Sequence, residues 1–182
     1  HGIRDDDYFV CCNPDLFISP AMLALLHDQL LARKPRLAAI NLFSDFSMKC
    51  PDFSIRHFPL IGDYLTRRSE VGTSAVIDKR LVTKPQFCDW AAGSFLVFRS
   101  ELYRSIGGFD ERYFMYFEDA DICLRARRQL HERVLYLPQV QAVHRGAFNN
   151  RNVFSRHFYW YLSSMLRYFL RYYGGEAVRR SL

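Results

Sequence analysis

The residues best suited to chemistry lie near the end of one stretch, Gly107 to Arg125, which closes with three carboxylates, Glu118, Asp119 and Asp121. They follow a run of aromatic and apolar residues and stand at the start of a segment whose pattern predicts a helix. Carboxylates in a first helical turn are stabilised by the exposed amides and the helix dipole, and such capping accounts for one or two of them. Three acids behind an aromatic wall indicate a sheltered cleft in which a proton or a metal ion is handled.

Two further candidates follow predicted strands. Asp15, in the sequence Asn13-Pro14-Asp15, comes after an apolar run at residues 8–12, and His144 comes after another at residues 134–143. In open α/β sheets, ligands bind beyond the carboxyl ends of the strands. Both residues can therefore face the same cleft as the helix carboxylates, although a lone histidine at a strand end is more often structural.

Together these side chains indicate group transfer from a phosphate-activated donor. Mg²⁺ and Mn²⁺ take oxygen ligands, and Mn²⁺ also accepts imidazole. Asp15 and His144 therefore qualify as metal ligands that leave coordination positions open for a diphosphate, whose charge the metal would neutralise. Asp119 qualifies as a general base that removes a proton from an attacking hydroxyl.

The elements that must position these residues alternate between strands and helices. We expect strands at 8–12, 37–43, 87–99 and 134–143, the last with a bulge or an edge at Pro138, and helices at 19–33, 100–106, 118–130 and 154–173. This order predicts an α/β fold with a parallel or mixed sheet. Residues 44–85 are expected to form a long loop with a short helix near 60–68, whose basic residues either meet a phosphate-bearing substrate or are solvated. The acidic residues 5–7 are expected in a solvated loop.

The segment Asp89-Trp90-Ala91-Ala92-Gly93 is a candidate ligand contact at the start of the third strand. Its small residues leave room for a ligand to approach the backbone, and Trp90 offers an apolar face for stacking. A tightly packed strand explains the same residues equally well.

The composition is that of one globular domain: 182 residues, 49% hydrophobic and 24% charged. Five scattered cysteines without a Cys-x-x-Cys pair argue against a disulfide framework or a zinc site and favour a reducing compartment. The sequence contains no apolar run of the 18 residues or more expected of a membrane span.

The net charge of +6 resides in residues 145–182, which hold seven arginines and one glutamate. The helix predicted at 154–173 carries aromatic residues on one side, with Arg156, Trp160, Arg167 and Arg171 on the other. This profile predicts a helix in a membrane interface, with these four residues contacting an anionic surface. Packing on its own domain or on the second copy of a homodimer is the alternative. Nucleic-acid binding is disfavoured because the aromatic residues lie opposite the arginines.

Several of these residues also carry a resemblance. Asn13-Pro14-Asp15, Trp90-x-x-Gly93, Gly107-Gly108-Phe109-Asp110-Glu111, Tyr116-x-Glu118-Asp119-x-Asp121 and the late His144 together resemble family 2 glycosyltransferases of the GT-A fold. The resemblance is strongest to bacterial rhamnosyltransferases and runs from Asp5 to about Tyr172. It implies a Rossmann-like mixed sheet flanked by helices.

The resemblance implies a role for each matching residue. Asp15 matches the last acid of the metal motif, with Asn13 in the place of the first and beside the donor diphosphate, and His144 completes the Mg²⁺ or Mn²⁺ site. Asp119, with Glu118, matches the catalytic acidic pair. Gly93, together with Trp90 and Asp121, falls where such enzymes hold the sugar and the acceptor.

The resemblance also implies the reaction and its setting. An inverting enzyme would move L-rhamnose from dTDP-L-rhamnose to a hydroxyl of a lipid-linked glycan in O-antigen or related polysaccharide synthesis, at the cytoplasmic, inner face of the bacterial cell membrane. Because such enzymes begin with a nucleoside-binding segment, residues 1–150 are expected to be the C-terminal two-thirds of a GT-A catalytic domain and 151–182 an amphipathic helix and tail. The alternative is a catalytically incomplete fragment that acts as an oligomerising or membrane-binding module.

Overall fold

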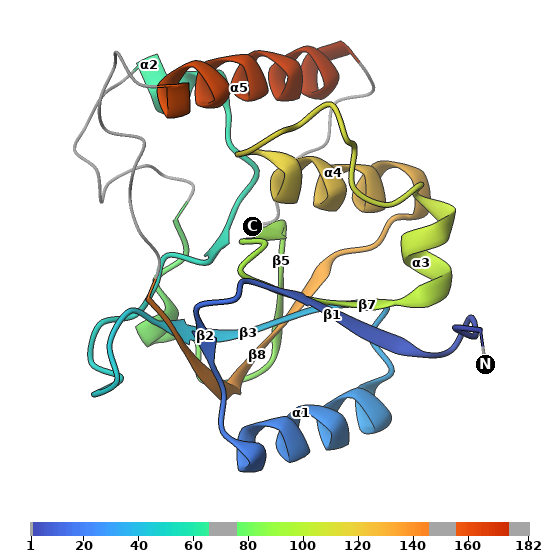
Figure 1. Ribbon diagram of the computed structural model, residues 1–182, viewed down its shortest axis with the longest axis vertical. Helices are drawn as coiled ribbons and strands as arrows, with labels where there is room; N and C mark the ends of the chain where they lie inside the picture. Colours follow the sequence, from blue (N-terminus) through green and yellow to red (C-terminus); the bar gives the residue numbers. More distant parts are fainter. Residues whose placement is uncertain (1, 66–75, 146–155, 175–182) are drawn as a thin grey trace.

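The computed structural model describes residues 2–65, 76–145 and 156–174, in which helices flank both faces of a mixed β-sheet (Figure 1). Helix α1 covers one face, and α3, α4 and α5 lie on the other. This arrangement confirms the α/β fold with a mixed sheet flanked by helices. The helices span the following residues: α1 Pro20–Arg33, α2 Ile61–Leu65, α3 Ser100–Ser105, α4 Glu118–Leu130 and α5 Arg156–Gly174.

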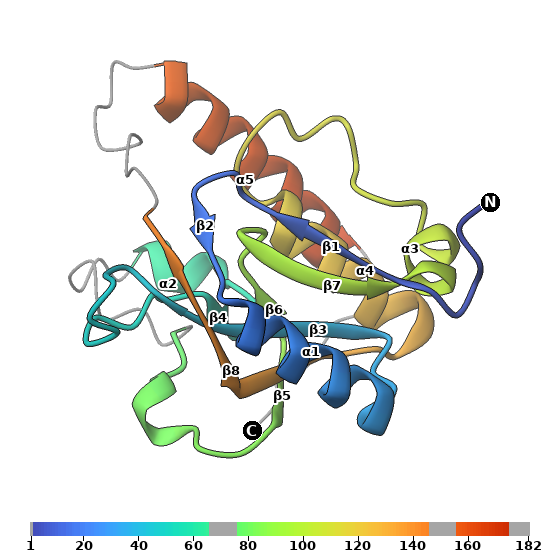
Figure 2. The ribbon, with the colours of Figure 1, turned by 60° about the horizontal axis from the view of Figure 1, so that its bottom comes forward.

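The main sheet has six strands. Their spatial order is β1 (Tyr8–Cys12), β7 (Phe95–Arg99), β3 (Leu37–Phe43), β8 (Val134–His144) and β2 (Leu16–Phe17), and β5 (Gln86–Cys88) also pairs with β8. Figure 2 shows the neighbouring strands β1, β7 and β3 side by side. Because β1 and β3 both run antiparallel to β7 and β8 runs parallel to β3, the strands β1, β3 and β8 share one direction. Their carboxyl ends therefore meet at one edge of the sheet.

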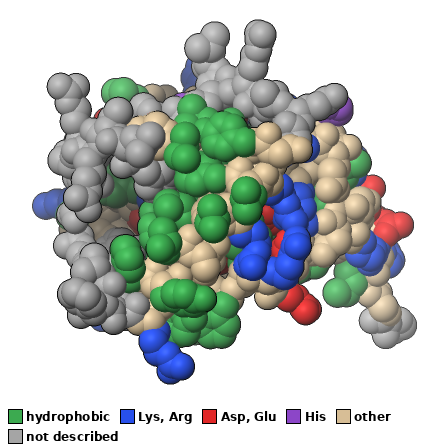
Figure 3. Space-filling view, turned by 90° about the horizontal axis from the view of Figure 1, so that it is seen from above, with side chains coloured by type: hydrophobic (Ala, Val, Ile, Leu, Met, Phe, Trp, Pro, Cys, Tyr) green, Lys and Arg blue, Asp and Glu red, His purple; other side chains and the backbone are tan. Residues whose placement is uncertain are grey.

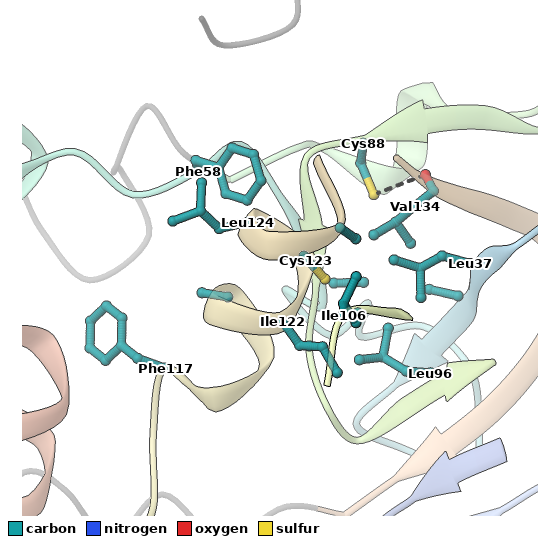
Figure 4. Close-up of a cluster of buried hydrophobic side chains, with 14 of the residues drawn as sticks. Leu37, Phe58, Cys88, Leu96, Ile106, Phe117, Ile122, Cys123, Leu124 and Val134 are labelled. Carbon is teal, nitrogen blue, oxygen red and sulfur yellow. Dashed lines mark hydrogen bonds between the residues drawn. The ribbon is translucent and has the colours of Figure 1, made fainter. Parts of the chain in front are cut away.

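Alternation along the strands builds a core on each face of the sheet. On β3, Ala38, Ile40 and Leu42 pack with Leu26 and Leu30 of α1, as expected for side chains that alternate between the two faces. The odd-numbered neighbours Leu37 and Ala39 belong to the other core, which α4 and α5 cover. Figure 4 shows Leu37 and Leu96 of the sheet near Ile122 and Cys123 of α4.

Local signals explain several element ends. Ser19 caps α1, accepting a hydrogen bond from the backbone N–H of Met22, and Pro20 is its first residue. The chain leaves α3 through Gly107 and Gly108, whose φ angles of 75° and 66° lie in the left-handed region that glycine adopts without strain. The N-cap of α3 is Arg99, whose side chain makes no capping hydrogen bond, and Ser100 is the first residue of the helix. The Ser100 hydroxyl donates to the backbone oxygen of Asp7 and ties the strand β1 to the helix.

The expected strand at 87–99 is divided into three. Between β5 and β7, the chain leaves the main sheet as β6 (Trp90–Ala91) and pairs with β4 (Ile55–Arg56) in a separate two-stranded sheet. The prediction of one continuous strand was wrong because the chain turns at residues 92–94, between β6 and β7. The bulge predicted at Pro138 is confirmed: Leu137 pairs with Ile40, but Asn41 pairs with Gln141, so β8 holds three extra residues there.

The loop expected at 44–85 is partly structured where it is described. It contains β4, the short helix α2 and a 3₁₀ turn at Lys79–Leu81. Asp5 and Asp6 are exposed and Asp7 is half-buried, in agreement with a loop at the surface. Among the described helices, none has both the length and the apolar character that crossing a bilayer requires.

Candidate active site

A cleft of about 730 Å³ opens at the edge of the sheet where β1, β3 and β8 end. Asn13 and Asp15 follow β1, Ser44 follows β3, and His144 ends β8. The opposite wall holds the turn at residues 92–94 and the first two residues of α4, Glu118 and Asp119. The structure therefore brings the predicted candidates of the sheet edge and of the helix into one cleft.

His144 stands at the centre of the sheet side of the cleft. Its Nε2 accepts a hydrogen bond from the Asn13 amide at 3.0 Å, and its Nδ1 donates to Asp52 Oδ2 at 3.3 Å. Asp15 Oδ1 lies 3.6 Å from the same Nε2. In the neutral ring, these contacts place the proton on Nδ1 and the lone pair on Nε2, where it accepts from Asn13 with Asp15 nearby. The hydrogen bond to Asp52 raises the pKa of His144, against the effect of its partial burial.

Sequence reasoning missed Asp52. It lies in the irregular segment after β3, where no periodic pattern marks it. A bridge between Phe43 and Pro51 and a hydrogen bond from Asp52 N to Leu42 O hold this segment alongside the end of β3. Asp52 therefore reaches His144, 92 residues later in the chain, through pairing at the strand end.

The described residues offer two ligands for a divalent cation. Asp15 and Asp52 lie at opposite ring nitrogens of His144, so the two carboxylates do not converge on one ion. Accordingly, no group of three or more His, Cys, Asp or Glu side chains in the described ranges is placed to share a metal ion. Asp15 and Nε2 of His144 do fit as a pair on one side, with Asp52 behind the imidazole in the position that commonly orients a metal-binding histidine.

On the other wall, Asp119 is held by backbone amides. Its Oδ2 accepts from Gly93 N at 2.9 Å and its Oδ1 from Ala120 N at 2.7 Å. A β-carbon on Gly93 would lie 3.4 Å from that of Asp119, so the backbone approaches the carboxylate closely there. Tyr116 and Phe117, just before the helix, both have φ above 60°, an uncommon left-handed conformation for such residues. This turn aims the acidic pair into the cleft.

Burial sets the proton affinity of the acidic pair. It raises the pKa of Glu118 to about 7, with a further contribution from the neighbouring Asp119 charge. Burial also raises the pKa of Asp119, although the amides of Gly93 and Ala120 and the charge of Arg56 oppose it. Two adjacent carboxyls of this kind titrate as a pair, and a pKa near neutrality suits a general base.

We expect the rate of the reaction in this cleft to depend on the proton of this pair. The base Asp119 has a raised pKa and is protonated and inactive at low pH, so kcat/KM should rise with pH above the usual range of an aspartate and then level off. Glu118→Gln removes a negative neighbour of Asp119 and should shift this rise to lower pH. The folding stability should change in the opposite sense, because the folded state binds the proton of Glu118 more tightly than the unfolded state does. The free energy of unfolding should therefore fall as the pH rises from about 4.5 to about 7. A pH–rate profile without a rise in this range, in both proteins, would contradict the assignment.

The structure corrects two predicted sugar-binding residues. Asp121 is fully buried, with 0% exposure, and does not line the cleft. It accepts hydrogen bonds from Arg125 Nε at 2.8 Å and from the Tyr113 hydroxyl at 3.1 Å, and it pairs with Arg171. Trp90 also lies outside the cleft lining. Its Nε1 donates to the backbone oxygen of His57 at 2.9 Å, and its ring packs against the larger core.

Helix α5 also differs from the expectation. Its aromatic residues Tyr168, Phe169 and Tyr172, expected to dip into a membrane, are buried in the domain core. Arg171 is tied to Asp110 at 2.9 Å and to Asp121, and the guanidinium of Arg167 lies over the ring of Tyr113. These two arginines thus bind the domain.

Of the other two predicted contacts on α5, Trp160 packs beside Phe114 at 4.5 Å between ring centroids, and Arg156 is exposed. The helix instead presents a different apolar stripe, which Figure 3 shows as a band of hydrophobic side chains beside a group of Lys or Arg. Its exposed residues are Tyr159, Leu162, Leu166, Leu170 and Tyr173.

Comparison with known proteins confirms the resemblance to rhamnosyltransferases. The chain is 34% identical over 170 residues to rhamnosyltransferase WbbL of Escherichia coli (strain K12), in a match covering 92% of this chain and 63% of that protein. It is 30% identical over 155 residues to N-acetylglucosaminyl-diphospho-decaprenol L-rhamnosyltransferase of Mycobacterium tuberculosis (strain ATCC 25618 / H37Rv), covering 78% of this chain and 48% of that protein. The chain thus spans between about half and two thirds of the length of these relatives. No protein-family model matches it.

Proposed function

We propose that this chain, a relative of rhamnosyltransferases, contains the acceptor-activating part of an inverting glycosyltransferase of the GT-A type. The observation that carries the proposal is the cleft itself, in which a buried carboxylate of raised pKa, Asp119, faces the Asp15–His144 pair at the sheet edge. The inferred reaction moves L-rhamnose from dTDP-L-rhamnose to a hydroxyl of a lipid-linked glycan in polysaccharide synthesis. The name of the mycobacterial relative, with its diphospho-decaprenol acceptor and L-rhamnosyl group, supports this choice of substrates.

The chemistry we infer is a single displacement. The acceptor oxygen forms a bond to the anomeric carbon of the donor sugar while the bond from that carbon to the nucleoside diphosphate breaks. The diphosphate leaves with the electron pair, and Asp119 takes the proton of the attacking hydroxyl. Because attack and departure occur on opposite faces of the carbon, the configuration is inverted.

A divalent cation, Mg²⁺ or Mn²⁺, belongs to the proposal. Asp15 and His144 would hold it, and it would neutralise charge on the departing diphosphate when bound. Asn13 supplies an amide where a second acid would strengthen binding, and it contacts the Nε2 atom of His144. Asp52 accepts the Nδ1 proton, which leaves the lone pair on Nε2 in the neutral ring.

A transfer assay tests the proposal on the full chain. The protein is mixed with dTDP-L-rhamnose, Mn²⁺ and a short-chain N-acetylglucosaminyl diphospholipid, with EDTA added in a parallel sample, and calorimetric titration measures donor binding. Rhamnosyl transfer that EDTA abolishes supports the enzyme and its metal. The absence of both donor binding and transfer would favour the alternative, a catalytically incomplete fragment serving as an oligomerising or membrane-binding module.

We also propose that the exposed stripe of α5 contacts an anionic membrane, which would place the protein at the cytoplasmic face of the cell membrane. The helix contains no acidic residue, and Arg112 and Arg167 lie with Leu166 and Leu170 around one hollow of its surface. Apolar side chains beside cations suit the interface of an anionic bilayer. In the alternative, a second copy of the chain would bury the same stripe in a homodimer.

Replacing one leucine of the stripe should weaken vesicle binding. Leu166→Asp should lower the affinity for anionic phosphatidylglycerol vesicles by about tenfold or more, because it removes a buried leucine from the contact and adds a negative charge. The matched control is Leu31→Asp in α1, because Leu31 is 58% exposed and Leu166 is 59% exposed. Equal flotation of the wild type and Leu166→Asp would contradict membrane contact, and a monomer–dimer shift in ultracentrifugation would favour the homodimer.

A further inference from the structure

Arg56 is a cation in an otherwise acidic cleft. Of the described residues that line it, four are carboxylates, Asp15, Asp52, Glu118 and Asp119, and Arg56 is the one Lys or Arg. A phosphate group entering this cleft needs a positive partner, because the carboxylates repel it. A cation bound at Asp15 and His144 would serve one end of the cleft only.

The side chain of Arg56 is fixed from behind. Arg56 lies opposite Trp90 in the β4–β6 pair, and its guanidinium carbon lies 5.3 Å from the centroid of the Trp90 ring. Arg56 Nε donates to the backbone oxygen of Phe53 at 2.8 Å. Trp90 is itself held by its hydrogen bond to His57. The indole ring of Trp90 and the guanidinium of Arg56 are thus both held in place, in a geometry that suits cation–π stacking.

Among the residues that the structure describes, the terminal nitrogens of Arg56 take part in no ion pair. Arg112, Arg125 and Arg171 each pair with a carboxylate, whereas Arg56 has no acidic partner within 4.0 Å among the described residues. A fixed guanidinium that lines a cleft and keeps its terminal donors available is suited to bidentate recognition of a phosphate.

The position of Arg56 indicates which of the two substrates, donor or acceptor, it binds. It lies in β4, whose partner strand β6 leads directly into the turn that binds Asp119 through Gly93 N, and both Arg56 and Asp119 line the cleft. In an inverting displacement, the base and the acceptor lie on the face of the anomeric carbon opposite the leaving diphosphate. A cation beside the base therefore lies on the acceptor side, and the Asp15–His144 end lies on the donor side.

From this geometry, and building on the function proposed above, we propose that Arg56 binds a phosphate oxygen of the acceptor, next to the sugar whose hydroxyl Asp119 activates. Arg56 is thus the residue that determines the preference for a glycosyl diphosphate acceptor over an uncharged glycoside. The diphosphate of the donor is the competing ligand, because it offers Arg56 the same kind of phosphate oxygen.

Calorimetric titration of three ligands distinguishes the acceptor from the donor as the ligand of Arg56. The ligands are a short-chain N-acetylglucosaminyl diphosphate ester, the octyl glycoside of N-acetylglucosamine and dTDP-L-rhamnose, each titrated into the wild type, Arg56→Ala and Arg56→Lys. We expect Arg56→Ala to weaken binding of the diphosphate ester by about 10- to 100-fold, with no change for the glycoside or the donor. Arg56→Lys should lie between, because it retains the charge and loses the planar fork. Arg80→Ala, at an exposed arginine outside the cleft, is the matched control.

Three results would overturn the proposal: equal affinity of the wild type and Arg56→Ala for the diphosphate ester, no preference of the wild type for that ester over the glycoside, or a loss confined to the donor. Transfer of rhamnose to the octyl glycoside is measured separately, because it depends on Asp119 and not on a phosphate contact. Transfer to the glycoside with equal affinities would reject the role of Arg56 while retaining the enzyme.

Discussion

Asp119→Asn should lower kcat for sugar transfer by about 10²- to 10⁴-fold, the usual contribution of a general base. The amide cannot accept the proton of the attacking hydroxyl, although it occupies nearly the same volume. KM for the donor should remain close to that of the wild type, since the proposed donor site lies at the other end of the cleft, near Asp15 and His144. Steady-state kinetics with both substrates varied would measure the two effects separately.

Asparagine at this position also changes the local hydrogen bonding. Both oxygens of Asp119 accept from backbone amides, of Gly93 and of Ala120, and an NH₂ group cannot accept from either. A thermal unfolding curve must therefore accompany the kinetics. Glu111→Gln, at an exposed carboxylate outside the cleft lining, is the control and should keep full activity. Undiminished turnover by Asp119→Asn would show that another group is the base.

Asp121→Ala should be the most destabilising single substitution near the site, by about 3–5 kcal/mol in the free energy of unfolding. Arg125, buried to 91%, would lose its carboxylate partner, and Arg171 would keep Asp110 alone. For a domain of this size, the midpoint of thermal unfolding should fall by about 6–20 °C, measurable by circular dichroism. If the alanine variant does not fold, Asp121→Asn tests the same network with a smaller loss.

Asp78→Ala provides the contrast. Asp78 also pairs with an arginine, Arg80, but that pair stands in solvent. Its removal should lower the unfolding midpoint by only about 2–4 °C, because exposed ion pairs are screened by water and salt and the main loss is the hydrogen bond that Asp78 accepts from Arg80 N at the start of the 3₁₀ turn. A similar fall in both variants would mean that burial does not determine the contribution of the Asp121 network.

Local signals in the sequence were sufficient for much of the fold. The strand at 37–43 and the helix at 118–130 lie where a continuous apolar run and the acidic first turn placed them. Ser19, Pro20 and Gly107–Gly108 act within their own turns, so their effect is visible in a short stretch of sequence. The α/β order then brought Asp15 and His144 to one edge without further information.

The different surroundings of Asp119 and Asp121 also follow from the geometry of the helix that carries them. Residues two apart on a helix differ by about 200° in direction. When one of them points into the cleft, the other must point away from it, and Asp121 accordingly meets Arg125 and Arg171. Helical periodicity therefore already indicated that the two acids would have different surroundings.

Long-range pairings were not predictable in the same way. Asp52 contacts His144 only because the chain after β3 folds back on its strand end, and Arg56 faces the cleft only because β4 pairs with β6. On α5, aromatic and aliphatic residues occur on several sides, so the pattern alone did not decide which side the core would bury. The packing of Tyr168, Phe169 and Tyr172 against the rest of the core decides it.

The bulge in β8 gives this fold a rule for insertions and deletions. The three extra residues 138–140 stand between the part of β8 that pairs with Ile40 and the part that ends in His144. Across the bulge, the residues of β8 that face the α1 core change from the odd-numbered Leu135 and Leu137 to the even-numbered Val140 and Ala142. The direction of His144 is therefore set by its own pairing with Leu16 and by the pairing of residues 141–143 with β3, and not by alternation counted from Leu135. A change of length within residues 138–140 can accordingly be absorbed by the bulge while His144 still faces the cleft.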